Sequence, residues 1–231
     1  MFLWILITLL AIWLCLSLYI YLQRILPKDL KKTLNWSKFA SIEEMSDKER
    51  FLFGCVAGGC VGDYLGFLCE GDGAQNSSLV AKEIKNSKLS FSASLLRISL
   101  SKNNHYFGQV SDDSQLSVAL LRSLADKEGR FDAQDYAAKI AVLFKTSVVV
   151  GCGLATAKAA AKLNRGVSWE ESGSREGEAG NCPATRCALL GCFAFDEDEL
   201  VKMCVQQSSI THKDKRCAAG SVNNTSLLFL N

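Results

Sequence analysis

A long uncharged stretch at the N-terminus constrains the fold of this chain more than any other feature. Residues 2–22 contain no charged side chain and are mostly Leu, Ile, Trp, Phe and Tyr. Such a run is long enough to cross a bilayer as a helix, and its aromatic residues suit the membrane interfaces. We therefore expect a transmembrane anchor over residues 1–23 and a basic juxtamembrane linker over residues 24–45.

The charges that flank this stretch predict its orientation. Arg24, Lys28, Lys31 and Lys32 follow the stretch, and no Lys or Arg precedes it. By the positive-inside rule the C-terminal side then faces the cytoplasm, where thiols stay reduced. A cleaved signal peptide is the alternative, but it would need a basic start, a shorter apolar core and a small-residue cleavage site, and none is evident.

Composition excludes several classes of function. A formal net charge of +2 gives no electrostatic basis for binding nucleic acid, so we expect no nucleic-acid partner. Two histidines are too few for a His-rich metal site. The ten cysteines lack the C-x2-C spacing of zinc sites and mostly lie among small apolar residues. We interpret them chiefly as buried hydrophobic residues.

Helix-start signals recur along the chain, and no alternating strand pattern does. Ser46 and Glu49 form a capping box before a segment with glycines at positions 54, 58, 62 and 66. That row predicts a helix with another backbone packed closely on its glycine face. Further helices are predicted over residues 78–85, 91–101, 111–127, 133–145, 155–163, 184–195, 196–207 and from residue 216, with a polar loop over residues 166–180. The fold class is therefore predicted to be all-α, although residues 91–100 also fit a strand.

The central motif is Ser111-Asp112-Asp113, which directly precedes an apolar-periodic run. A hydroxyl and two carboxylates at this place are typical of a helix N-terminus, where they cap free N–H groups and complement the macrodipole. Oxygen ligands on a rigid element are also typical of a hard-metal site. The two interpretations are compatible, because the same residues can do both.

Four motifs follow one another in an order that carries a resemblance. They are Gly62-Asp-Tyr-Leu-Gly66 with Glu70, Gly108-Gln-Val-Ser-Asp-Asp-Ser-Gln115, Gly180-Asn-Cys-Pro-Ala-Thr-Arg186 and Ser208-Ser-Ile-Thr-His-Lys-Asp214. Over roughly residues 50–222 this succession resembles the ADP-ribosylglycohydrolase family, whose relatives include the dinitrogenase-reductase-activating glycohydrolases. Members typically show G-D-x-x-G…E, T-D-D-T/S-Q, G-N-G-x-x-M-R and T-H-x-D.

The resemblance implies a fold, a metal and roles for particular residues. It implies a compact all-α domain, here residues 46–231, around two Mg²⁺ ions that orient a ribose and hold or activate a water. Ser111, Asp112 and Asp113 match one set of metal ligands, and Asp112 and Asp113 would thereby serve catalysis. Glu70 matches a glutamate that acts as a base or positions ligands; a solvated helix-end charge is the alternative.

The later motifs would provide the ligand-binding residues. Asn181 and neighbouring amides would line the ADP-ribose site, and His212 would contact the ligand or pack the following helix. Cys182 replaces the second Gly of G-N-G, Pro183 follows it, and Thr185 stands where Met is usual. The family's second ligand set, Asp-x-Asp-Thr, has no match after Thr211-His212, so we expect a domain that is incomplete at its C-terminus.

Two functions follow from the resemblance. The first is Mg²⁺-dependent hydrolysis of the glycosidic bond in ADP-ribosylated protein or a related ADP-ribosyl small molecule, by a membrane-anchored hydrolase. The alternative is a catalytically inactive remnant that binds ADP-ribose or a protein partner.

Overall fold

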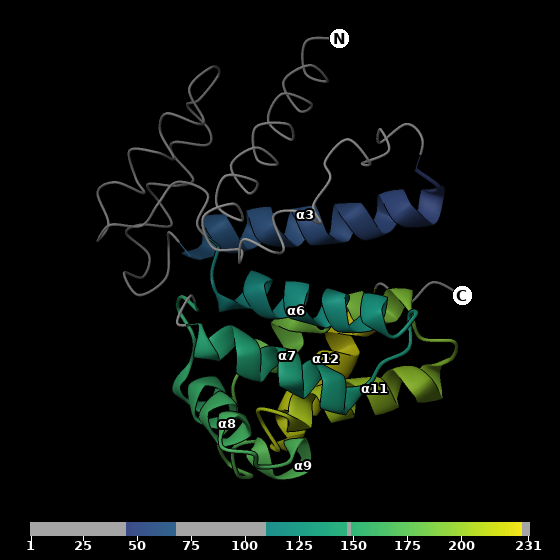
Figure 1. Ribbon diagram of the computed structural model, residues 1–231. Coiled ribbons are helices and arrows are strands. Elements are labelled where there is room, and N and C mark those ends of the chain that lie inside the picture. Colours follow the sequence, from purple (N-terminus) through teal and green to yellow (C-terminus); the bar gives the residue numbers. More distant parts are fainter. Residues whose placement is uncertain (1–44, 68–109, 147–148, 228–231) are drawn as a thin grey trace, which may run out of the picture. The chain divides into compact units, whose positions relative to one another are not determined.

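The structure, a computed structural model, describes residues 45–67, 110–146 and 149–227. Its elements are α3 (Asp47–Phe67), α6 (Asp112–Asp126), α7 (Ala133–Lys145), α8 (Leu154–Asn164), α9 (Trp169–Ser172), α10 (Cys182–Arg186), the 3₁₀-helix η3 (Ala188–Cys192), α11 (Glu197–Ser209) and α12 (Lys215–Ser226) (Figure 1). The described residues contain no strand, and one isolated parallel bridge joins Ser174 to His212. The all-α prediction is confirmed.

The chain divides into two compact units. One comprises Met1–Arg50 and Leu68–Gln109, of which the structure describes residues 45–50. The other comprises Phe51–Phe67 and Val110–Asn231 and holds α6 to α12. In this second unit α6 packs beside α7, α7 beside α8, and α12 against α10 and α11 (Figure 1). Its core is formed by buried apolar faces of these helices, including Leu116, Leu120, Leu124, Tyr136, Ile140, Leu190 and Ile210.

The predicted helix starts rest on side-chain caps that the structure contains. Ser46 and Glu49 form the reciprocal bonds of a capping box, because Oε2 of Glu49 accepts from the Ser46 N–H and Oγ of Ser46 accepts from the Glu49 N–H. Asp132 and Asp196 each accept a bond from an N–H in the first turn of their helix. The helix predicted over residues 111–127 corresponds to α6, and the chain leaves it at Gly129, which has φ +84° and donates to the Leu124 carbonyl.

The single helix predicted over residues 184–195 was wrong. The structure breaks it after Arg186 into α10 and η3. A continuous α-helix would need the Ala184 carbonyl to accept from the Ala188 N–H. That carbonyl instead accepts bonds from Asn224 Nδ2 at 2.8 Å and from the Cys187 thiol at 3.1 Å. Packing against α12 therefore replaces the helical bond and tightens the chain into a 3₁₀ turn.

The uninterrupted polar loop predicted over residues 166–180 was also wrong. It contains α9, whose Ser172 is fully buried and donates to the Ile210 carbonyl at 2.7 Å. Ser174 then pairs with the chain around His212 through two backbone bonds of 2.9 and 3.1 Å. Polar residues in this segment are buried because they satisfy backbone groups of the core. A prediction that takes polar residues to be solvent-exposed loop residues is therefore wrong here.

The glycine row of α3 did not produce the predicted close backbone contact among the described residues. A Cβ added at positions 54, 58, 62 or 66 would meet none of their atoms within 4 Å. No described helix combines the length and apolar character needed to cross a membrane. The proposed anchor at residues 2–22 and the helices predicted over residues 78–85 and 91–101 lie outside the described residues.

Candidate metal and active site

The start of α6 is fixed by a carboxylate from another helix. Asp63 of α3 accepts the Ser111 hydroxyl at Oδ1 over 2.6 Å. Its Oδ2 accepts the backbone N–H groups of Ser111 and Ser114 at 2.9 and 3.1 Å. Ser111 in turn caps the helix, because its Oγ accepts from the Asp113 N–H at 3.2 Å. Asp63 thus caps α6 from outside and holds its first turn in place.

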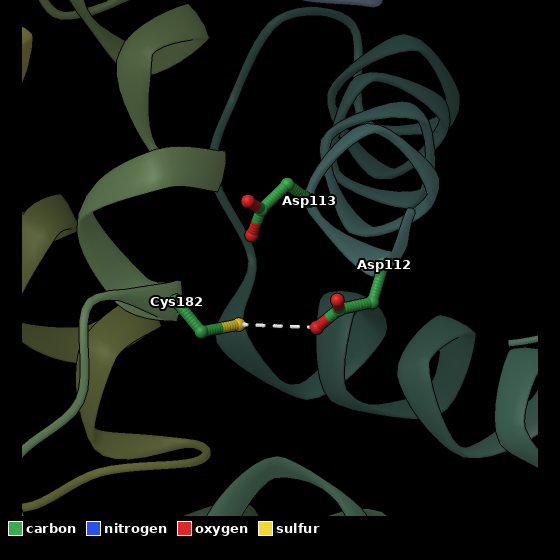
Figure 2. Close-up of side chains that lie close together, drawn as sticks. All are labelled: Asp112, Asp113 and Cys182. Carbon is green, nitrogen blue, oxygen red and sulfur yellow. Dashed lines mark hydrogen bonds between the residues drawn. The ribbon is translucent and has the colours of Figure 1, made fainter. Parts of the chain in front are cut away.

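This first turn presents two acidic side chains to a cysteine on α10. Asp112, Asp113 and Cys182 each have a ligand atom within 4.8 Å of those of the other two, and we call them the Asp–Asp–Cys cluster. Figure 2 shows the two carboxylates leaving the same helix end, with the Cys182 thiol directed at Asp112. The thiol donates to Asp112 Oδ2 at 3.8 Å. Asp112 and Cys182 are buried and Asp113 is half-buried, so the cluster lies at the edge of the core.

Asp113 is oriented by a residue that departs from the family pattern. Thr185 Oγ1 donates to Asp113 Oδ1 at 2.6 Å. Burial raises the pKa of Asp113, and the charge of Asp63 raises it further, whereas the Thr185 bond and the nearby Arg186 lower it. The excess of carboxylates around the α6 terminus gives this region the charge that attracts a divalent cation.

A buried arginine lies behind the cluster. Arg186 has no exposed surface, and its guanidinium lies over the Tyr136 ring at 5.7 Å. It donates to the side-chain and backbone oxygens of Gln207 at 2.9 and 2.8 Å and to Thr211 Oγ1 at 2.8 Å. Its Nη1 donates to Cys182 Sγ at 3.6 Å. Among the described residues no carboxylate bonds to this cation, so neutral acceptors and the sulfur solvate it.

The structure brings together three of the predicted site residues. Ser111, Asp112 and Asp113 share the α6 terminus, as the sequence suggested. One of the two hydroxyl lone pairs of Ser111 accepts the Asp113 N–H, which leaves the second as a possible metal ligand. Glu70 lies outside the described residues. Asn181 is exposed next to Cys182, where its carbonyl accepts from the Ala184 N–H at 2.8 Å.

His212 is buried and supports the loop that carries Asn181. Its ring lies so close to Gly180 that a Cβ added there would be 2.7 Å from Nε2. Its Nδ1 is 2.9 Å from Thr211 Oγ1. Burial, with help from the Arg186 charge, lowers the pKa of His212 to about 4, so the ring is neutral at pH 7. A neutral ring can accept the Thr211 hydroxyl proton at Nδ1 and leave that oxygen free to accept from Arg186.

Sequence reasoning did not assign Cys182 or Thr185 to this site, because both were interpreted as departures from the family pattern. For Asp63 the sequence left open whether it supports the site or caps a helix, and the structure shows that it caps α6. The pairing of Thr185 with Asp113 spans 72 positions, and that of Asp63 with Ser111 spans 48, so no local pattern reports either. The sequence did contain one signal that Cys182 lies near Arg186. The two residues are four positions apart, which places them on the same face of a helix.

The donor set determines which cation the site can hold. Two carboxylates are suitable ligands for Mg²⁺, which takes one or two carboxylates and keeps several waters. The thiol is not a magnesium ligand, but it is a good ligand for zinc and other soft cations. The described site therefore fits a divalent cation, with the sulfur as the donor that distinguishes one metal from another.

Comparison with known proteins adds one finding. Residues 44–228 match the family described as ADP-ribosylglycohydrolase, which covers most of the chain and all of the site. No significant match was found among curated proteins or solved structures.

Proposed function

Because the chain belongs to the ADP-ribosylglycohydrolase family, we propose that it hydrolyses the glycosidic bond that joins ADP-ribose to a protein side chain or to a related small molecule. The observation that carries this proposal is the pair Asp112 and Asp113, held side by side at the α6 terminus by Asp63. Two fixed carboxylates at the edge of a core are what a cation-dependent hydrolase needs.

The residues of the site divide the work of hydrolysis. Asp112 and Asp113 bind the cation, and Thr185 keeps the Asp113 carboxylate in one orientation. When bound, Mg²⁺ supplies positive charge that orients the ribose hydroxyls and a water. In this proposal Glu70 is the base that takes a proton from that water. The hydroxide adds to the anomeric carbon, the glycosidic bond breaks, and the proton passes to the leaving side-chain atom.

Residues of the neighbouring loop complete the proposed ligand site. Asn181 lies next to Cys182 and is exposed, so its amide is free to reach a bound ADP-ribose. His212 does not contact the ligand in this proposal. Its buried ring packs against Gly180 and so supports the loop that carries Asn181. Glu70 remains the proposed base or ligand-positioning residue of the segment that follows α3.

A second candidate is an inactive protein that binds ADP-ribose or a protein partner. Cys182 stands where the family pattern has Gly and Pro183 follows it, and the two residues restrict the backbone at the start of α10. A stiffer backbone at this place favours a site that retains its ligand over one that closes around a transition state.

Release of ADP-ribose by the purified full-length chain tests both candidates. With Mg²⁺ the wild type should release ADP-ribose from an ADP-ribosylated protein, and Asp112→Asn should reduce the rate at least 100-fold, about 3 kcal/mol of activation free energy. Asp198→Asn, an equal charge change on the exposed first turn of α11, serves as the matched control. Binding of ADP-ribose by a wild type that shows no turnover would exclude the hydrolase and support the second candidate.

We also propose that residues 2–22 anchor the protein in a membrane with the helical domain on the cytoplasmic side. The proposal rests on the uncharged run and the basic residues that follow it. Retention of the full-length chain in the membrane pellet after carbonate extraction is expected. Its release into the supernatant would contradict the anchor.

A further inference from the structure

We propose that Cys182 is a metal ligand and that the Asp–Asp–Cys cluster therefore takes Zn²⁺ in preference to Mg²⁺. The inference concerns the site used in the proposed function, and it depends on the positions of three ligand atoms rather than on turnover. It rests on three properties of the described residues: the distances in the cluster, a hydroxyl beside the thiol and the chemistry of the donors.

The distance between the Cys182 sulfur and the Asp112 carboxylate suits a cation that replaces the thiol proton between them. The Cys182 thiol donates its proton to Asp112 Oδ2 across 3.8 Å. Zinc bonds to thiolate sulfur and carboxylate oxygen are about 2.3 and 2.1 Å, so one ion between these atoms would make an angle of roughly 120°, close to tetrahedral. The nearest oxygen of Asp113 completes a set whose members all lie within 4.8 Å of one another (Figure 2).

A buried hydroxyl beside the sulfur lacks a partner. Thr156 of α8 has no exposed surface, and its Oγ1 has no hydrogen-bond partner within bonding distance among the described residues. Burial raises the pKa of the Cys182 thiol, which is therefore protonated without a metal, although the neighbouring Arg186 and Thr156 lower that pKa. A buried hydroxyl without an acceptor costs about 1–3 kcal/mol, and a metal-bound thiolate is an acceptor. Loss of the thiol proton to a metal would thus satisfy Thr156.

The chemistry of the donors then selects the metal. Mg²⁺ is a hard cation that binds oxygen in octahedral geometry. Zn²⁺ accepts sulfur and oxygen together and exceeds Mg²⁺ in affinity for a site that contains a thiolate. Catalytic zinc sites have three protein ligands and one open position for water, which is the number of ligands in this cluster. The sulfur that departs from the family pattern is therefore the residue that sets metal preference in this chain.

Cobalt reports the sulfur ligand directly, without substrate. Metal-free full-length chain titrated with Co²⁺ should develop an intense near-ultraviolet charge-transfer band from thiolate to metal. Cys182→Ser should abolish the band, and Cys55→Ser, a half-buried cysteine on α3, should keep it. Competition with a chromophoric chelator should show Zn²⁺ affinity reduced at least about tenfold by Cys182→Ser, with Mg²⁺ affinity nearly unchanged. Circular dichroism checks that the variants fold.

A measurement on the wild type avoids any dependence on variants. Zinc-edge X-ray absorption of the loaded chain should show a sulfur neighbour at about 2.3 Å. Oxygen and nitrogen neighbours alone, or a cobalt band that persists in Cys182→Ser, would overturn the proposal. ADP-ribose release with Mg²⁺ but no sulfur–metal signal would leave the proposed function intact. A sulfur–metal signal in a protein that does not release ADP-ribose would support the sulfur ligand and contradict the proposed hydrolase function.

Discussion

At the scale of single residues, Asp63 shows how a side chain outside the motif core organises the site. Three donors from the α6 terminus converge on its carboxylate, two of them backbone N–H groups that a helix cannot satisfy internally. A carboxylate at this place also complements the helix macrodipole. Asp63 therefore determines where Asp112 and Asp113 point, although it belongs to a different helix.

Removal of this carboxylate should destabilise the fold and weaken the site together. We expect Asp63→Ala to lower the free energy of unfolding by about 2–3 kcal/mol, because charged hydrogen bonds at partly buried groups are worth that much in sum. Urea denaturation followed by circular dichroism measures the loss. Asp63→Asn, which keeps one acceptor oxygen, should lose about half as much.

Asp198→Ala supplies the comparison for this measurement, since Asp198 is an exposed acidic residue in another first turn. Its unfolding free energy should stay within about 0.5 kcal/mol of the wild type, as is usual for surface substitutions. Equal losses in Asp63→Ala and Asp198→Ala would show that the carboxylate of Asp63 does not organise α6.

At the scale of elements, the sequence predicted those helices whose ends carry local signals. The boundaries of α7 follow from Asp132 as a cap, and those of α6 from Ser111 and Gly129. The break after Arg186 was not predictable from local pattern, because it depends on Asn224, almost forty residues later. Local caps are encoded locally, whereas competition for a carbonyl by a distant side chain is not.

The glycines of α3 offer a test at this scale. A Cβ at position 54 or 58 meets no atom of the described residues within 4 Å, and Ala is about 1 kcal/mol better than Gly in a helix interior. Gly54→Ala and Gly58→Ala should each raise the free energy of unfolding by about 0.5–1 kcal/mol, measured in urea. A loss of stability would show that the glycine face does pack against another surface.

Gly129→Ala is the natural contrast to these two substitutions. Gly129 has φ +84°, and a Cβ there would be 3.3 Å from the Phe193 ring, so this change should destabilise by about 1 kcal/mol or more. The change in unfolding free energy should thus be positive at Gly54 and Gly58 and negative at Gly129. This difference in sign would show that the stabilisation in α3 is not a general effect of Gly→Ala.

At the scale of the whole molecule, burial of His212 couples stability to pH. Folding lowers the pKa of this ring from 6.5 to about 4, so the unfolded chain binds a proton that the folded chain does not. Stability is therefore greatest above about pH 6.5 and is lost as the pH falls towards 4. The loss from this group amounts to about 3 kcal/mol. Arg186 opposes protonation of the ring, and Asp214 and Glu178 favour it.

The difference between wild type and His212→Asn isolates this contribution. Unfolding free energies measured between pH 7.5 and 4.5 should fall more steeply in the wild type, because both chains share every other titrating group. If the unfolding free energies of the two chains fell in parallel with pH, the pKa of His212 would be the same in the folded and unfolded states.

The domain as a whole was predictable from motif order, but the site was predictable only in part. Asp112 and Asp113 were found because they are adjacent in sequence and lie at a helix start. Cys182 was not found as their partner, because 69 positions separate it from Asp113 and its neighbours suggested a buried thiol. Convergence of α6 and α10 is a property of packing, and packing over such distances leaves no periodic trace in a single sequence.

The buried arginine has a consequence for how motifs in such chains should be interpreted. Arg186 and Thr211 belong to the motifs that identified the family, yet their bonds lie inside the core, to each other and to Gln207, Cys182 and His212. Asp214, in the same motif as Thr211, caps α12 and holds the Gly177 N–H. A descendant that had lost all catalysis would still need these residues to fold. The presence of these residues is therefore evidence for a stable domain of this fold, and the chemistry has to be argued from other residues of the site.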